Sequence, residues 1–277
     1  MIKIGSHISF KKPGYLVEAA KESLNNNANT MMLYLGAPQS TTRVPVENYR
    51  LNEYLDEYAK YIPQEDIIIH APYVINPANP DKALYSNDFL IKEIKRMNHI
   101  GAKYLVLHPG AYTTHETQEA LDQLVDSLKY ILENTQDVVI CLETMSGKGT
   151  EIGINFEQIR FLLDWVNSPR LKVCLDTCHL WDAGYDLQNY EEFKTELNKY
   201  NLLDEIKIIH LNDSKHEIFS RKDRHANIGK GTIGLKTLKK FVHDPDFDNI
   251  PIILETPWVN DEPIYKQEIQ MLLDSND

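Results

Sequence analysis

The sequence is poor in cysteine and contains no long apolar run. Its three cysteines, Cys141, Cys174 and Cys178, are an odd number without a CxxC spacing, which argues against a disulfide framework and a cysteine-based zinc site. The longest apolar runs are far too short to span a bilayer, and no basic and apolar leader opens the chain. We therefore expect a cytoplasmic protein without membrane contact, whose thiols are buried and unpaired.

Positive charge is also scarce, because 29 Lys and Arg residues stand against 41 Asp and Glu residues, for a formal net charge of −12. Nucleic-acid-binding proteins usually carry a basic footprint, so the overall charge counts against such a partner. The common phosphate-binding loops are missing as well. No GxGxxG follows an apolar run, and the glycine pairs at 147–149 and 229–231 do not match G-x-x-x-x-G-K-[ST].

Short apolar runs alternate with amphipathic stretches along the whole chain. The runs predict strands at residues 2–5, 30–35, 67–70, 104–108, 138–143, 171–176, 206–210 and 251–255. The amphipathic stretches predict helices at residues 15–23, 46–61, 86–99, 116–133, 155–167, 189–200, 235–242 and 263–273. Eight alternations and 277 residues are typical of a (β/α)8 barrel. We predict an α/β fold, a single-domain TIM barrel over residues 1–277, with a doubly wound open sheet as the alternative.

Six consecutive predicted strands end on a histidine or an acidic residue. In chain order these are His70, His108, Glu143, Asp176, His210 and Glu255. Such side chains are costly inside a barrel unless they are paired or bound to metal. The residues two positions earlier share their face and are apolar, namely Ile68, Val106, Cys141, Cys174, Ile208 and Ile253. The pattern predicts metal ligands above an apolar barrel interior.

Three further donors stand outside the strands: His179 beyond the sixth strand, and Asp223 and His225 in the loop after the seventh. Five imidazoles and four carboxylates are too many for one ion. Without thiolate they suit zinc, manganese or iron, at three or four protein ligands per ion, so two or three ions are implied. Taken alone, Asp176 and His179 would equally fit a strand-end turn with a helix N-cap. Asp182, near Gly184, is expected to be a turn residue, and His216 an exposed loop residue.

Four motifs in the second half of the chain resemble the signatures of the endonuclease IV family of apurinic/apyrimidinic endonucleases. They are residues 174–179 (CLDTCH), 209–214 (IHLNDS), 223–229 (DRHANIG) and 253–256 (ILET). The resemblance runs from residues 5–7 (GSH) through His70 and residues 108–110 (HPG) to Glu255. It implies three Zn²⁺ ions and a role for each of the nine candidates. Glu143 would bridge two ions, His70 and His108 would complete the first site, Asp176, His210 and Glu255 the second, and His179, Asp223 and His225 would hold the third.

The resemblance also implies a reaction and a partner. The family hydrolyses the phosphodiester bond 5′ to an abasic site in duplex DNA, leaves a 3′-hydroxyl and removes 3′-blocking groups. A metal cluster can supply the attacking hydroxide because it lowers the pKa of bound water to about 7. We therefore expect a monomeric, zinc-dependent DNA-repair endonuclease in which Glu143 is the catalytic ligand.

Three residues match positions that the family uses to contact DNA: Tyr73, Val74 and Gln39. At Gln39 some relatives place an arginine that enters the DNA stack, so a different residue must supply that cation here. The negative net charge does not exclude DNA binding, because the loops after the predicted strands contain several cationic side chains. These are Lys11, Lys12, Arg43, Lys148, Lys215, Arg221, Lys222, Arg224 and Lys230.

Two other functions fit part of the pattern. A sugar isomerase or epimerase of the related xylose-isomerase-like barrels needs only Glu143, Asp176, His210 and Glu255, and would leave the other five donors unused. A metal-dependent DNA-binding protein without catalysis would use the same cluster as the endonuclease. Only activity can separate these last two functions.

Overall fold

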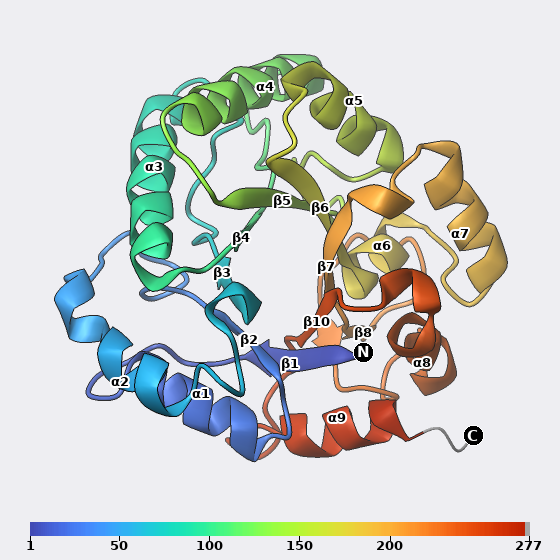
Figure 1. Ribbon diagram of the computed structural model, residues 1–277. Coiled ribbons are helices and arrows are strands. Elements are labelled where there is room, and N and C mark those ends of the chain that lie inside the picture. The colour runs from blue at the N-terminus through green and yellow to red at the C-terminus, as the bar shows by residue number, and fades with distance from the viewer. Residues whose placement is uncertain (275–277) are drawn as a thin grey trace.

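The structure, a computed structural model, describes residues 1–274 and closes eight parallel strands into a barrel (Figure 1). The barrel strands are β1 (Lys3–His7), β2 (Thr30–Leu33), β3 (Ile67–His70), β4 (Tyr104–Leu107), β5 (Val139–Glu143), β6 (Leu171–Asp176), β7 (Ile206–His210) and β10 (Pro251–Leu254). Strand β1 pairs with both β2 and β10, so the sheet has no free edge. The predicted single (β/α)8 barrel is confirmed and the open sheet is wrong. The exact domain bounds stay a prediction, since residues 275–277 lie outside the described residues.

Helices form a ring around the barrel (Figure 1). They are α1 (Leu16–Asn25), α2 (Leu51–Glu57), α3 (Ala83–Ile100), α4 (Thr117–Glu133), α5 (Phe156–Val166), α7 (Tyr190–Lys199), α8 (Leu235–His243) and α9 (Tyr265–Leu273). Their apolar stripes face the strands. Leu121, Leu124, Val125 and Leu128 of α4, for example, are buried at three and four residue spacing. Short 3-10 turns, η2 (Gln64–Asp66), η3 (Leu203–Glu205) and η4 (Pro245–Phe247), precede three of the strands. No helix among residues 1–274 is both long and apolar enough to cross a bilayer.

Two predicted elements differ from the structure. The helix predicted over residues 46–61 is split into a 3-10 turn, η1 (Val46–Tyr49), and the shorter α2, because Arg50 between them has a left-handed backbone with φ of 58°. The turn predicted after β6 is a helix, α6 (Thr177–Ala183), which Asp176 caps at its start and Gly184 ends at φ of 113°. The loop after β7 contains a two-stranded ladder of β8 (Asp213–Ser214) and β9 (His225–Ala226).

The barrel interior is filled by a separate small apolar cluster. It consists of Met32, Ile68, Val106, Cys141, Cys174, Ile208 and Ile253, each with no exposed surface. Six of these seven residues were predicted from the period-two pattern, so the shared face is confirmed. Cys141, Cys174 and Cys178 are free and buried, as predicted. This interior cluster, called the apolar floor below, lies directly beneath the side chains at the strand ends.

Candidate metal centre

The carboxylate of Glu143, at the end of β5, lies at the middle of the strand-end cluster and is 1% exposed. Its Oε2 lies 3.1 Å from Nε2 of His70 and 3.1 Å from Nε2 of His108. Its Oε1 lies 3.2 Å from Nδ1 of His210 and 3.3 Å from Nδ1 of His179. The two oxygens therefore face two different groups of imidazoles, which is the arrangement a bridging carboxylate requires.

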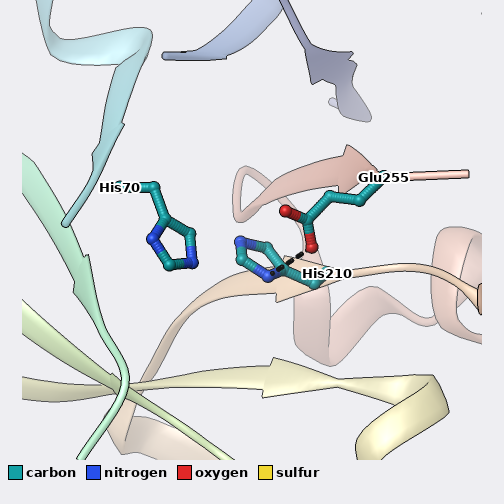
Figure 2. Close-up of side chains that lie close together, drawn as sticks. All are labelled: His70, His210 and Glu255. Atoms are coloured by element: carbon teal, nitrogen blue, oxygen red, sulfur yellow. Dashed lines mark ion pairs between the residues drawn. The ribbon is translucent and has the colours of Figure 1, made fainter. Parts of the chain in front are cut away.

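A second group forms where β7 and β10 end, facing the end of β3 across the barrel. Nδ1 of His210 lies 3.0 Å from Oε2 of Glu255, and His70 turns its ring toward the same space from the other side (Figure 2). Donor atoms of His70, His210 and Glu255 all lie within 4.8 Å of one another, and so do those of Glu143, Asp176, His210 and Glu255. These side chains come from strands far apart in sequence, which the closed barrel brings to one end.

A third group lies between α6 and the loop after β7. Nε2 of His179, in the first turn of α6, is 3.1 Å from Oδ1 of Asp223. Nε2 of His225 is 3.8 Å from Oδ1 of Asp223 and 3.8 Å from Oδ2 of Asp176. Asp176 thus contacts this group and the previous one. All nine predicted ligands are brought together, while their individual assignment to ions stays a prediction.

Backbone carbonyls fix the orientation of three of the imidazoles. Nδ1 of His70 lies 2.7 Å from the carbonyl oxygen of Ala71, Nδ1 of His179 lies 2.9 Å from that of Thr144, and Nδ1 of His225 lies 3.1 Å from that of Glu255. A carbonyl only accepts, so each Nδ1 donates and each Nε2 is directed into the site. Metal-binding histidines characteristically use their second nitrogen in this way.

The distances from Nε2 of His225 to the neighbouring carboxylate oxygens fit a shared cation better than direct hydrogen bonds. Its Nε2 is buried and has no hydrogen-bond partner among residues 1–274. The two carboxylate oxygens at 3.8 Å are too far away for a hydrogen bond. Atoms that each bond a zinc ion at about 2.0–2.2 Å are separated by a comparable distance. The residues present therefore fit a cluster of divalent transition-metal ions held by nitrogen and oxygen.

The cluster carries strong mutual electrostatic effects. Burial alone would raise the pKa of Glu143, but His210 and His108 hold it well below its usual range. Burial alone would lower the pKa of His179, but Asp176, Asp223 and Glu143 raise it well above its usual value. Charged imidazole beside charged carboxylate is therefore the stable arrangement of the metal-free protein, and protons compete with metal for the same nitrogens.

Asp182 was missed by the sequence analysis, and its prediction as a turn residue is wrong. It is fully buried on α6, where Oδ1 accepts from the hydroxyl of Ser214 at 2.8 Å and Oδ2 accepts from the backbone N–H of Asp223 at 2.7 Å. Asp223 itself has a left-handed backbone with φ of 51°. Asp182 therefore fixes the strained loop that presents Asp223. In the sequence its position beside Gly184 looks like an ordinary turn.

Asn212 is a second residue with a role that the sequence analysis did not assign. Its side-chain amide donates to Oδ2 of Asp176 at 2.8 Å, and its side-chain carbonyl accepts from the backbone N–H of Glu255 at 2.9 Å. Its own backbone N–H donates to the hydroxyl of Thr177 at 2.8 Å. It links two of the ligand-bearing strand ends across β7. In the sequence it stands two residues after a strand-end histidine, inside the motif at residues 209–214.

The residues predicted to contact DNA lie on the loops after β2 and β3. Tyr73 and Val74 are 55% and 45% exposed, and Gln39 is exposed as well. The backbone N–H of Tyr73 donates to the carbonyl of Pro38 at 3.1 Å, so the two loops are joined beside the site. Tyr73 is not packed into the core, which leaves it accessible to a ligand. DNA contact by these three residues stays a prediction.

Arg43 and His216 differ from their predicted placement. The Arg43 side chain is 1% exposed and pairs with the buried Glu93 at 2.7 Å, so it does not join the cations at the strand ends. His216 is half-buried rather than exposed, and its carbonyl accepts from Nε1 of Trp181 at 3.0 Å. Lys148 is placed as expected, with Nζ 3.6 Å from Oδ2 of Asp223. The other predicted loop cations are exposed, namely Lys11, Lys12, Lys215, Arg221, Lys222, Arg224 and Lys230.

Comparison with known proteins agrees with this geometry. Residues 19–275 match the family described as xylose isomerase-like TIM barrel. Two relatives named probable endonuclease 4, from Mycoplasmopsis synoviae and Mycoplasmopsis agalactiae, are 71% and 65% identical over 99% of each chain. The crystal structure of endonuclease IV from Thermus thermophilus is 25% identical, covers 98% of this chain and 97% of its own, and has a TM-score of 0.81. A D-tagatose 3-epimerase-like protein, 20% identical with a TM-score of 0.69, shares the fold alone.

Proposed function

The chain belongs to the endonuclease IV family of xylose isomerase-like TIM barrels, and we propose that it hydrolyses the phosphodiester bond 5′ to an abasic site in duplex DNA. The cut leaves a 3′-hydroxyl, and the same site removes 3′-blocking groups. The protein acts as a monomer in the cytoplasm. The relatives' name, probable endonuclease 4, supports a nuclease.

The observation that carries this proposal is the size of the donor cluster. A sugar isomerase or epimerase needs the group of Glu143, Asp176, His210 and Glu255, which is one of the groups in the structure. Five further donors face the same space and would have no function in such an enzyme, namely His70, His108, His179, Asp223 and His225. A site for several ions explains all nine side chains and suits phosphodiester hydrolysis.

Three Zn²⁺ ions are the proposed cofactor. Glu143, together with His70 and His108 and with Asp176, His210 and Glu255, would hold two of them, and His179, Asp223 and His225 would hold the third. When bound, such ions supply Lewis acidity that activates water near neutral pH and offsets the charge developing on a phosphodiester. Donor chemistry supports zinc, because imidazole and carboxylate without thiolate suit this metal.

The surrounding loops are proposed to select the substrate. Lys148, beside Asp223, and the exposed lysines and arginines of the loop after β7 would contact backbone phosphates. Tyr73, Val74 and Gln39 would contact the duplex at the lesion from the loops after β2 and β3. An abasic nucleotide has no base to unstack, so turning it toward the site costs less than the few kcal/mol of ordinary base flipping.

A duplex containing one abasic site tests this function. The metal-loaded protein is expected to nick that duplex on the 5′ side of the lesion and to leave an otherwise identical undamaged duplex intact. Glu143→Gln removes a charged ligand at the bridging position and is expected to abolish the cut. An uncut abasic duplex together with epimerisation of a ketose would establish the sugar-enzyme alternative instead.

A further inference from the structure

A groove on the flank of the barrel lies apart from the metal centre. Its volume is about 640 Å³, and it is lined by residues 43–47 on one side and by α3 on the other. Helix α3 runs back from the carboxyl ends of the strands toward β4, so the groove side chains in its second half lie away from the strand ends. The volume is in the range of small-molecule sites, about 300–1,000 Å³.

The wall formed by α3 is a stripe of basic side chains. Lys92, Lys95, Arg96 and His99 recur at three and four residue spacing, so they share one face of the helix and line the groove together. Like charges at this spacing destabilise a helix. Lys92 and Lys95 have no ion pair within 4.0 Å among residues 1–274, and the chain as a whole carries −12. Two lysines without an ion pair, beside Arg96 and His99 on an acidic protein, indicate that a negatively charged ligand offsets the repulsion.

The base of the groove contains a buried arginine with unused hydrogen-bonding capacity. Nε of Arg43 donates to Glu93 at 2.7 Å, and Nη1 donates to the carbonyls of Ser40 and Thr42, each at 2.9 Å. The guanidinium carbon lies 4.9 Å from the centroid of the Phe89 ring. Nη2 is buried without a partner among residues 1–274. Buried donors are nearly always satisfied, so this orphan marks a position where a further acceptor is expected.

The remaining wall is apolar. Val44, Pro45 and Val46 line the groove opposite the basic stripe, and Glu47 is the one acidic residue among those that line it. Glu93 neutralises part of the charge of Arg43 and Arg96, to which it is paired at 2.7 and 3.3 Å. Two lysines therefore remain free to bind an anion, next to a surface that suits a non-polar group.

We propose that this groove binds the phosphate group of a small phosphomonoester such as a nucleoside monophosphate. Lys92, Lys95 and Arg96 contact the phosphate, Arg43 supplies a fixed positive charge beneath it, and residues 44–46 pack against the rest of the ligand. Charge-assisted hydrogen bonds from lysine and arginine are the usual means of holding phosphate. The site is independent of the proposed nuclease function and of the metal centre.

Calorimetric titration of the metal-loaded protein with AMP and with inorganic phosphate tests the proposal. The unaltered protein is expected to bind one AMP outside the metal centre. The double variant Lys92→Ala/Lys95→Ala is expected to raise the dissociation constant by about tenfold or more, the loss expected from two charge-assisted contacts. The control variant Lys129→Ala/Lys236→Ala, which removes two exposed helical lysines elsewhere, is expected to bind as the unaltered protein does.

The controls separate this groove from other phosphate-binding surfaces. Equal AMP affinity in the Lys92→Ala/Lys95→Ala variant would place the binding at the metal centre and overturn the proposal. A lack of AMP binding by the unaltered protein would also overturn the proposal. This includes the case in which duplex DNA, but not AMP, binds in a way that depends on Lys92 and Lys95. Circular dichroism is expected to be the same for all variants, because the substituted lysines are exposed. Cleavage of abasic duplex is expected to be unchanged.

Discussion

At the scale of single residues, the site depends on the nine proposed ligands and also on side chains that hold those ligands in position by hydrogen bonds. Asn212 connects Asp176 to the backbone of Glu255, and Asp182 connects α6 to the loop that carries Asp223. Both side chains are fully buried. Both are satisfied by hydrogen bonds to groups whose positions the site requires, so their role is to position ligands.

Substitution of Asp182 tests this positioning role. Asp182→Ala leaves the hydroxyl of Ser214 and the N–H of Asp223 without acceptors, and is expected to destabilise the protein by about 1–3 kcal/mol. Because Asp223 is no longer held, the ion that Asp223 is proposed to bind is expected to lose about 10–100-fold in affinity. Asp182→Asn keeps one acceptor and is expected to recover part of both losses. Metal titration and denaturant unfolding would measure the two effects, and unchanged metal affinity in Asp182→Ala would exclude the role.

At the scale of elements, the proposed ligands divide into those on rigid strands and those on a loop. Six stand at the ends of barrel strands above the apolar floor, and His179 stands on α6. Asp223 and His225 instead belong to the segment between β8 and the end of β9, where Phe219, Arg221 and Asp223 all have positive φ. A loop with this strain keeps its shape only while its contacts hold. A change in this loop is therefore expected to weaken metal binding without unfolding the protein.

Asp223→Ala tests this expectation. The substitution is expected to remove the third ion and the nuclease activity while leaving the protein folded, because the Asp223 side chain is 28% exposed on a loop and is not part of the apolar core. Two retained ions per chain, with an unchanged circular dichroism spectrum, are the expected readouts. Unfolding of the variant would show that the loop is part of the structural core.

The strands and the polar side chains at their ends were predictable from the sequence for a physical reason. Strand side chains alternate with period two, so an apolar residue two positions before a polar strand end predicts both the floor and the site, as Ile208 and His210 illustrate. Helix α6 was not predictable, because seven residues contain too few turns to show helical periodicity. The position of Arg43 depends on the path of an irregular segment and on a partner fifty residues away, which no local pattern encodes.

At the scale of the whole molecule, metal loading is linked to protons. Burial would lower the pKa values of His108, His179 and His210, but all three are raised above the ordinary value. Nearby carboxylates raise the first two, and Cys174 followed by Glu255 and Glu143 raises the pKa of His210. The stability that these raised pKa values give to the metal-free protein is fully present below about pH 6.5 and is lost as pH rises through the folded pKa values. Depressed pKa values at Glu143 and Asp223 act in the opposite sense, and their contribution is lost as pH falls toward those values.

The proton linkage predicts a measurable release of protons. Metal binds neutral imidazole, so loading zinc at pH 7 is expected to release more than one proton per chain, and the number is expected to fall as pH rises. Calorimetric titration in buffers of different ionisation enthalpy measures this number. Zinc binding without proton release, or with a release that grows toward alkaline pH, would contradict the assigned protonation of the cluster.

We propose that nine side chains hold three ions at one end of the barrel. Crystals of the metal-loaded protein, measured with X-rays on both sides of the zinc absorption edge, test this most directly. We predict three anomalous peaks: one among His70, His108 and Glu143, one among Glu143, Asp176, His210 and Glu255, and one among His179, Asp223 and His225. A single peak beside Glu143, Asp176, His210 and Glu255, with the other five donors unbound, would contradict the account and support a sugar isomerase or epimerase.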